Sequence, residues 1–106
     1  MAVISINVQQ LKDKIREESP TLLDVREPDE FSICHIAGSI NVPMNSVPSR
    51  MMDFEIDQDI VVICHHGMRS AIVLDFLASR GFVRLSNLTG GIDAWAREID
   101  PSMARY

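Results

Sequence analysis

Residues 61–72 read VVICHHGMRSAI, and this stretch decides the fold class that the chain predicts. A β-branched apolar run ends at a cysteine, a short polar loop with a glycine follows, and a helical pattern then begins. The order predicts a buried strand at Ile60–Ile63, a tight loop after Cys64 and a helix start near Arg69. Ligands of parallel sheets bind beyond the carboxyl ends of strands, and Cys64 lies at such an end.

The rest of the chain alternates between short apolar runs and amphipathic segments. The other predicted strands are Val3–Ile6, Thr21–Val25, Val42–Pro43 and Val83–Leu88. The predicted helices are Val8–Glu18, Ser46–Met52, Arg69–Arg80 and Ile92–Glu98, and a loop with at most a helical turn is expected at Arg26–Glu30. This alternation predicts an α/β fold with three layers, in which helices cover both faces of a central, mostly parallel sheet.

Two of the predicted helices carry further signals. Asn7 is a plausible N-cap for the first helix, and Gln10 lies at the third helical position, as a capping box requires. The helix over Arg69–Arg80 is apolar almost all round, which predicts that it is well buried. It should end at Gly81, a typical residue just past a helix end.

Length and composition restrict the class of protein. The chain has 106 residues, 46% of them hydrophobic and 24% charged, which is typical of one soluble domain over residues 1–106. The net charge of −5 and the scattered basic residues argue against nucleic acid as a partner. No apolar run approaches membrane-spanning length, and no signal peptide is visible at the N-terminus. With only two cysteines, Cys34 and Cys64, a reducing cytoplasm is the expected location.

Four segments carry a resemblance to a known family. They read LDVREPDEF at 23–31, HIAGSINVP at 35–43, CHHGMRS at 64–70 and LTGGIDAW at 88–95. In this order and at these spacings they resemble the rhodanese family of sulfurtransferase domains, over nearly the whole chain. The resemblance implies a single small α/β domain in which Cys64 accepts a sulfur atom as a persulfide. The chain departs from the family at Cys34, where a glycine commonly precedes the histidine of the second segment.

The candidate site consists of the cysteine and the loop that follows it. Cys64 is the expected catalytic nucleophile, and the expected substrate-binding residues are His65, His66, Gly67, Met68 and Arg69. A Cys64 thiolate would attack the outer sulfur of a small sulfur-containing anion such as thiosulfate. Cyanide, another thiol or a thioredoxin-like protein would then take the sulfur. We expect no cofactor and no metal, and neither a nucleic-acid nor a membrane partner.

The loop should contribute mainly by electrostatics. Easier ionisation of a thiol raises the thiolate fraction but lowers its intrinsic nucleophilicity, so the net gain is only about 3-fold. Converging N–H groups that hold an anion contribute more. Gly67 would permit the backbone angles that aim these groups inward. Arg69 would supply a fork suited to sulfonate oxygens, while His65 and His66 would hydrogen-bond the anion or tune the thiolate.

Two other functions remain open at this point. Cysteine phosphatases and arsenate reductases also combine a nucleophilic cysteine with a loop and an arginine. Their loops commonly have five residues between the two, whereas four separate Cys64 from Arg69. The third interpretation is a non-catalytic rhodanese-like module that binds a partner or senses redox state, and the presence of Cys64 counts against it.

Several residues have structural interpretations that compete with functional ones. Asp24 and Arg26 should tie the end of a strand to the loops beneath the site, and Trp95 should anchor the last helix in the core. Cys34 is expected to be a packing residue, with a resolving thiol as the alternative. The histidines and cysteines at 34, 35, 64, 65 and 66 match no common zinc spacing.

Overall fold

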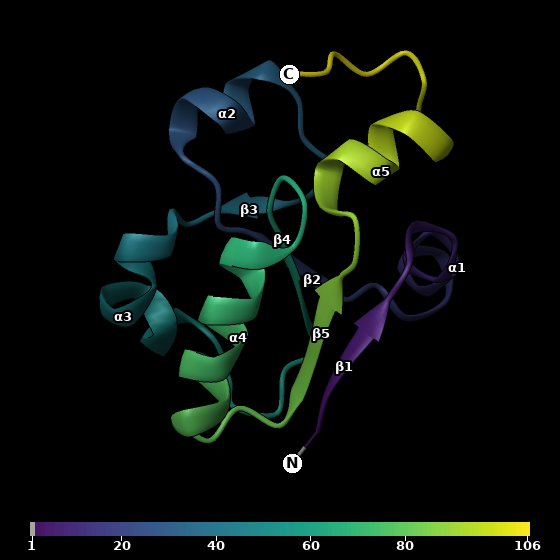
Figure 1. Ribbon diagram of the computed structural model, residues 1–106. Helices are drawn as coiled ribbons and strands as arrows, with labels where there is room; N and C mark the ends of the chain where they lie inside the picture. The colour runs from purple at the N-terminus through teal and green to yellow at the C-terminus, as the bar shows by residue number, and fades with distance from the viewer. Residues whose placement is uncertain (1) are drawn as a thin grey trace.

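The computed structural model describes residues 2–106 and contains one five-stranded sheet (Figure 1). The strands are β1 (Ala2–Ile6), β2 (Thr21–Asp24), β3 (Ile40–Asn41), β4 (Ile60–Ile63) and β5 (Arg84–Leu88). Their order across the sheet is β1-β5-β4-β2-β3, and every neighbouring pair is parallel. The predicted α/β class with a parallel sheet is therefore confirmed.

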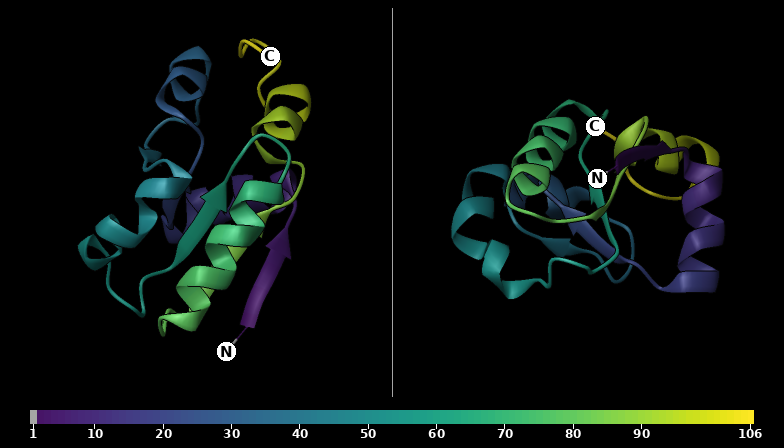
Figure 2. Two further views of the ribbon diagram at one scale, coloured as in Figure 1. Left: turned by 60° about the vertical axis from the view of Figure 1, so that its left-hand side comes forward. Right: turned by 90° about the horizontal axis from the view of Figure 1, so that it is seen from below.

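Helices cover both faces of this sheet, as Figure 2 shows. The helices are α1 (Val8–Glu18), α2 (Pro28–Ile33), α3 (Val47–Arg50), α4 (Met68–Ser79) and α5 (Gly91–Glu98), and the 3₁₀ turns η1 (Met44–Ser46) and η2 (Met51–Asp53) flank α3. Side chains of α1 and α5 pack in one buried cluster, and those of α3 and α4 pack in the other. Alternate residues of β4 belong to the two clusters because successive side chains of a strand point to opposite faces.

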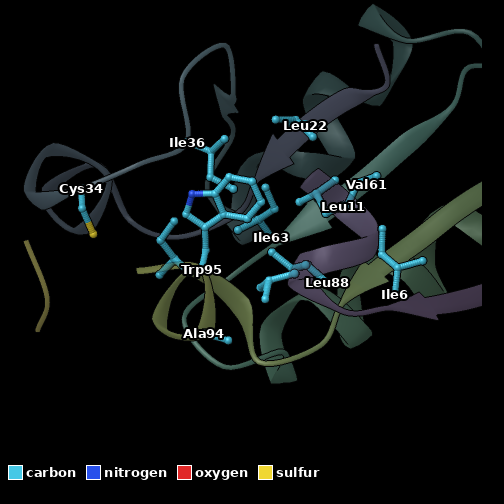
Figure 3. Packing of buried hydrophobic residues seen from close by; sticks show 12 residues of the cluster. Ile6, Leu11, Leu22, Cys34, Ile36, Val61, Ile63, Leu88, Ala94 and Trp95 are labelled. Atoms are coloured by element: carbon cyan, nitrogen blue, oxygen red, sulfur yellow. The ribbon is translucent and has the colours of Figure 1, made fainter. Parts of the chain in front are cut away.

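Trp95 anchors α5 in the first of these clusters (Figure 3). Its side chain is buried among apolar residues of the sheet and of the loop after α2, among them Ile36, Ile63 and Leu88. An indole of this size removes a large apolar area from water, which stabilises the docking of the helix. The expectation that Trp95 is a core anchor is confirmed.

One helix begins where the sequence predicts it, and another begins within a predicted loop. α1 spans the predicted residues, and its capping box is present: the Gln10 N–H donates to Asn7 Oδ1 at 2.8 Å, and the Asn7 N–H donates to Gln10 Oε1 at 2.8 Å. The expectation of a loop at Arg26–Glu30 underestimated the helix there, since α2 begins at Pro28. Proline suits the first turn of a helix, where its missing N–H has no partner to lose.

The prediction that the helix after Cys64 is well buried was wrong in part. α4 ends as expected just before Gly81, and Val73, Leu74 and Leu77 are buried. Ile72, however, is 60% exposed. The helix lies in an outer layer of the three-layer fold, so only one side of it can contact the sheet while the other faces solvent.

The topology brings the segments after β2 and β4 together. The two strands are parallel neighbours with Asp24 paired to Ile63, so the chain leaves both at the same edge of the sheet. Figure 1 shows the loop that follows β4 at this edge, between α5 and the top of α4, with the C-terminal segment running from α5 toward α2. Among residues 2–106 no helix has the length and apolar character needed to cross a bilayer.

Candidate functional site

The loop after β4 turns around the sulfur of Cys64. The Gly67 N–H donates to Cys64 Sγ with an N···S distance of 2.9 Å. Gly67 has φ +119°, in the left-handed region that side chains rarely adopt, and this angle lets its N–H point back into the loop. α4 begins at Met68, so the first N–H groups of that helix also have no partner within the helix.

Ser70 contacts the same sulfur. The Cys64 thiol donates to Ser70 Oγ at 3.4 Å, and Ser70 is completely buried. The Ser70 hydroxyl lies 2.6 Å from Asn87 Oδ1 and 3.0 Å from the Gly67 carbonyl oxygen, either of which it can donate to. Ser70 therefore links the thiol to β5, and its hydroxyl can turn to donate to the sulfur when the thiol ionises.

Cys64 itself is only 1% exposed. Burial of this kind is also typical of inert packing cysteines, which are common in protein cores. A packing thiol needs neither an N–H group that donates to its sulfur nor a hydroxyl that accepts from it. The combination of Gly67 and Ser70 around Sγ therefore favours a sulfur that carries charge.

Arg69 is held by a carboxylate of the chain itself. Its Nη1 and Nη2 atoms donate to the two Glu30 oxygens at 2.6 and 2.9 Å, in a bidentate pair. The hydrogen bonds from Arg69 lower the pKa of the Glu30 carboxyl from 4.5 to about 2, against the opposing effect of burial. The sequence predicts that Arg69 binds a substrate anion, whereas in this structure it binds the carboxylate of Glu30. The sequence did not indicate Glu30, because its approach to Arg69 depends on α2, and a loop is predicted where α2 begins.

A small cavity lies beside the same guanidinium. It has a volume of about 230 Å³ and is lined by Val25, Glu27, Met44, Asn45 and Arg69. A water molecule occupies about 30 Å³ in the liquid, so this space has room for a small anion with part of its hydration.

The two loop histidines have different surroundings. His65 is half-buried, and burial, together with the nearby His66, lowers its pKa from 6.5. His66 is exposed, and its Nε2 lies 3.8 Å from Asp93 Oδ2. The Met68 side chain is 81% exposed, so the residue can serve an anion in the loop only through its N–H. The six residues predicted for the site thus lie together in the loop after β4 and the first turn of α4, and the His66 and Met68 side chains are exposed.

Tyr106 closes the outer side of this loop. Its ring stacks on that of His65 with centroids 4.2 Å apart and an interplanar angle of 13°. Its hydroxyl accepts a hydrogen bond from Arg26 Nη1 at 2.9 Å and donates to Glu30 Oε2 at 3.1 Å. No feature of the sequence indicated these two hydrogen bonds, because Tyr106 is 76 positions from Glu30 and 80 from Arg26.

Asp24 and Arg26 support the site from below, as the sequence suggested. Both side chains are completely buried, and Arg26 Nε and Nη2 donate to the Asp24 carboxylate at 2.9 and 2.7 Å. Arg26 Nη2 also donates to the Cys34 carbonyl oxygen at 2.7 Å. A buried ion pair of this kind is tolerable because the remaining donors find acceptors, here in the segment around α2.

The start of α5 holds the same loop through its backbone. The Ile92 and Asp93 N–H groups donate to the carbonyl oxygens of Cys64 and His65 at 2.8 and 3.2 Å. Gly91 comes so close that a Cβ atom would collide with both oxygens. The occurrence of both motifs, residues 64–70 and 88–95, in one chain therefore has a structural basis, because the second segment packs directly against the backbone of the first.

Cys34 is a packing residue in this structure. It is 8% exposed and belongs to the buried cluster around Trp95, whereas Cys64 belongs to the cluster on the other face. Both thiols are free. The backbone angles of Cys34, φ −164° and ψ 148°, are those of extended chain that any residue adopts. The cysteine in place of the family's usual glycine therefore leaves the turn intact.

The geometry and the comparisons with known proteins agree on the class. A family model described as the rhodanese-like domain matches residues 7–98, and the chain belongs to this family. A thiosulfate sulfurtransferase GlpE of Pseudoalteromonas translucida is 32% identical over 105 residues, which cover 99% of this chain and 100% of that protein. A sulfurtransferase of Allochromatium vinosum is 35% identical over 96% of both chains. The crystal structure of a rhodanese-related protein from Thermoplasma volcanium superposes with a TM-score of 0.83 at 38% identity, over 91% of this chain and 93% of the other.

Proposed function

We propose that this protein is a thiosulfate sulfurtransferase of the rhodanese type, which carries a sulfane sulfur as a persulfide on Cys64. The observation that carries the proposal is the hydrogen bonding of Sγ: the Gly67 N–H donates to it at 2.9 Å, and the Ser70 hydroxyl, which accepts from the thiol, lies 3.4 Å from it. Both can donate to an anionic sulfur at this position, where water is largely excluded. Identity of 32–35% to named sulfurtransferases over nearly the whole chain supports it independently.

The reaction divides into two displacements. In the first, the Cys64 thiolate attacks the outer sulfur of thiosulfate, and the bond between the two thiosulfate sulfurs breaks. Sulfite leaves with the bonding electron pair, and a Cys64 persulfide anion remains. In the second, an acceptor thiolate attacks the terminal sulfur, takes it as its own persulfide and restores the Cys64 thiolate. With cyanide as acceptor the product is thiocyanate.

Different groups of the loop and of the start of α4 would bind different parts of the substrate. The N–H groups of Gly67, Met68 and Arg69 would hold the sulfur and the anion, because they lie at the turn and at the helix start. The Arg69 guanidinium would bind sulfonate oxygens in competition with Glu30. His65 and His66 would line the approach. The proposed unit of function is one rhodanese-like domain, and the proposed location is the cytoplasm, where two free thiols persist.

The test is the mass of the intact protein after brief incubation with thiosulfate. Wild type should gain one sulfur atom, and cyanide should remove it with release of thiocyanate. Cys64→Ser should gain nothing, whereas Cys34→Ser should behave as wild type. If wild type gained no sulfur from thiosulfate or from glutathione persulfide while Cys64 still reacted with iodoacetamide, the proposal would fail. Hydrolysis of an aryl phosphate under the same conditions would then point to the phosphatase alternative.

A further inference from the structure

The outer face of the Cys64 loop gathers three side chains that bind metals in other proteins. They are His65 and His66 of the loop and Asp93 of α5, and one ligand atom from each lies within 4.8 Å of the others. We propose that these three residues form a site for a zinc ion on the outer face of the Cys64 loop. Two imidazoles and one carboxylate, with the remaining position left to water, is a donor set that Zn²⁺ commonly accepts.

The distances require only small movements. Ligand atoms about 2.0–2.1 Å from a tetrahedral zinc ion lie roughly 3.3 Å from one another. His66 Nε2 and Asp93 Oδ2 are already 3.8 Å apart. His66 is exposed and can rotate, so it can complete the set without disturbing the core.

The two carboxylate oxygens of Asp93 have different neighbours, and this suits a metal ligand. Its Oδ1 accepts a hydrogen bond from Arg105 at 3.1 Å. Its Oδ2 faces His66, and the nearest Arg97 nitrogen is 3.9 Å from it, beyond hydrogen-bond distance. An outer partner that holds one oxygen and leaves the other toward the metal is the usual arrangement around ligating carboxylates. Because Arg105 and Arg97 both form ion pairs with this carboxylate and offset part of its negative charge, we expect micromolar rather than nanomolar affinity.

The backbone brings the three residues together before any ion arrives. The Asp93 N–H donates to the His65 carbonyl oxygen at 3.2 Å, and the adjacent Ile92 N–H donates to that of Cys64 at 2.8 Å. The stacking of Tyr106 on His65 restricts rotation of that ring. His65 and Asp93 therefore lose little conformational freedom on binding, and the cost of ordering falls mainly on His66.

An ion at this position would lie over the loop that contains Cys64. It would draw anions to itself and so compete with the Cys64 loop for an anionic sulfur donor, so zinc should act as an inhibitor. This consequence rests on the proposed function, whereas the binding of zinc does not. Binding can therefore be tested without any assay of sulfur transfer.

The experiment is competition for Zn²⁺ between the reduced full chain and a chromophoric chelator. Wild type should bind one zinc ion per chain, and His66→Gln and Asp93→Asn should each weaken binding about tenfold or more. His35→Gln is the matched control, since His35 is the one histidine outside the cluster and stacks on Phe31 instead. Cys64→Ser should bind zinc as wild type does, because the thiol is not a ligand.

Each outcome decides the matter. Absence of competition at micromolar protein concentrations would overturn the proposal. Binding that disappears in Cys64→Ser but survives in Asp93→Asn would overturn it too, because the ion would then be held by the thiol. Retention of wild-type affinity in either His66→Gln or Asp93→Asn would also exclude the site. A persulfide that forms normally in a chain that binds no zinc would leave the proposed function intact.

Discussion

The pair formed by Glu30 and Arg69 leads to the sharpest prediction about substrate binding. Arg69 is proposed to bind the oxygens of thiosulfate, yet both of its terminal nitrogens already donate to the Glu30 carboxylate. Glu30→Gln removes the negative charge but retains the shape of the side chain. The amide oxygen can still accept from the Glu27 N–H, which Glu30 Oε1 does at 2.9 Å, so α2 keeps its capping acceptor.

The size of the effect follows from the geometry of the pair. Opposite charges about 4 Å apart attract by about 4 kcal/mol at an effective dielectric constant near 20. The two side chains are 31% and 20% exposed, so solvent screening and desolvation reduce the net value to about 1–2 kcal/mol. An anion that needs Arg69 must overcome this amount. Since 1.4 kcal/mol corresponds to a factor of ten, Glu30→Gln should raise kcat/KM for thiosulfate about tenfold, mainly through a lower KM.

The assay is the rate of persulfide formation against thiosulfate concentration, at low and at high salt. Glu17→Gln is the matched control, because it makes the same change in net charge at an exposed position of α1. The gain for Glu30→Gln should shrink as salt rises, since salt screens the remaining charges. An unchanged or higher KM in Glu30→Gln would refute the idea that the carboxylate competes with substrate. It would show instead that Glu30 positions Arg69 for binding.

The pH dependence of stability checks that the pair is lost in this variant. The pKa of Glu30 is lowered from 4.5 to about 2, so the native state holds the carboxylate ionised more strongly than the unfolded chain does. The resulting stabilisation is complete above pH 4.5 and disappears as the pH falls toward 2. Wild type should therefore exceed Glu30→Gln in free energy of unfolding at neutral pH, and the difference should close over that acidic range. A difference that stays constant with pH would contradict the assigned cause.

Three further substitutions test other parts of the site. Arg69→Ala should slow persulfide formation from thiosulfate about 10- to 100-fold while alkylation of Cys64 by neutral iodoacetamide changes little, and equal losses in both would contradict the role of the charge. Asp24→Asn should cost about 3–5 kcal/mol in urea unfolding because it leaves the buried Arg26 charge uncompensated, and a cost below 1 kcal/mol would exclude that mechanism. Gly91→Ala should cost more than about 2 kcal/mol, since its φ is +59° and a Cβ would collide with the Cys64 carbonyl oxygen. A near-neutral effect of Gly91→Ala on thermal unfolding would mean that α5 shifts away at no cost.

Local signals in the chain predicted most of the elements that position the site. The apolar run at Ile60–Ile63 became the central strand, and the glycine three residues after Cys64 took the positive φ that the loop needs. The capping box at Asn7 set the start of α1. These features depend on neighbours within a few positions, which is why a single sequence reveals them. The burial of α4 was overestimated because a helix that is apolar almost all round does not reveal that it lies in an outer layer, where one side stays exposed to solvent.

What the sequence by itself determined was the parallel α/β class, the place of Cys64 at the end of a strand, and the loop that surrounds it. Only the tertiary structure decided what faces that loop: Glu30 on Arg69, Tyr106 on His65, and Asp93 beside His66. The physical reason is the range of the interactions. Strand, turn and cap preferences act between residues close in the chain. The contacts of Glu30, Tyr106 and Asp93 arise because the fold brings the ends of β2 and β4, α5 and the segment after α5 to one edge of the sheet.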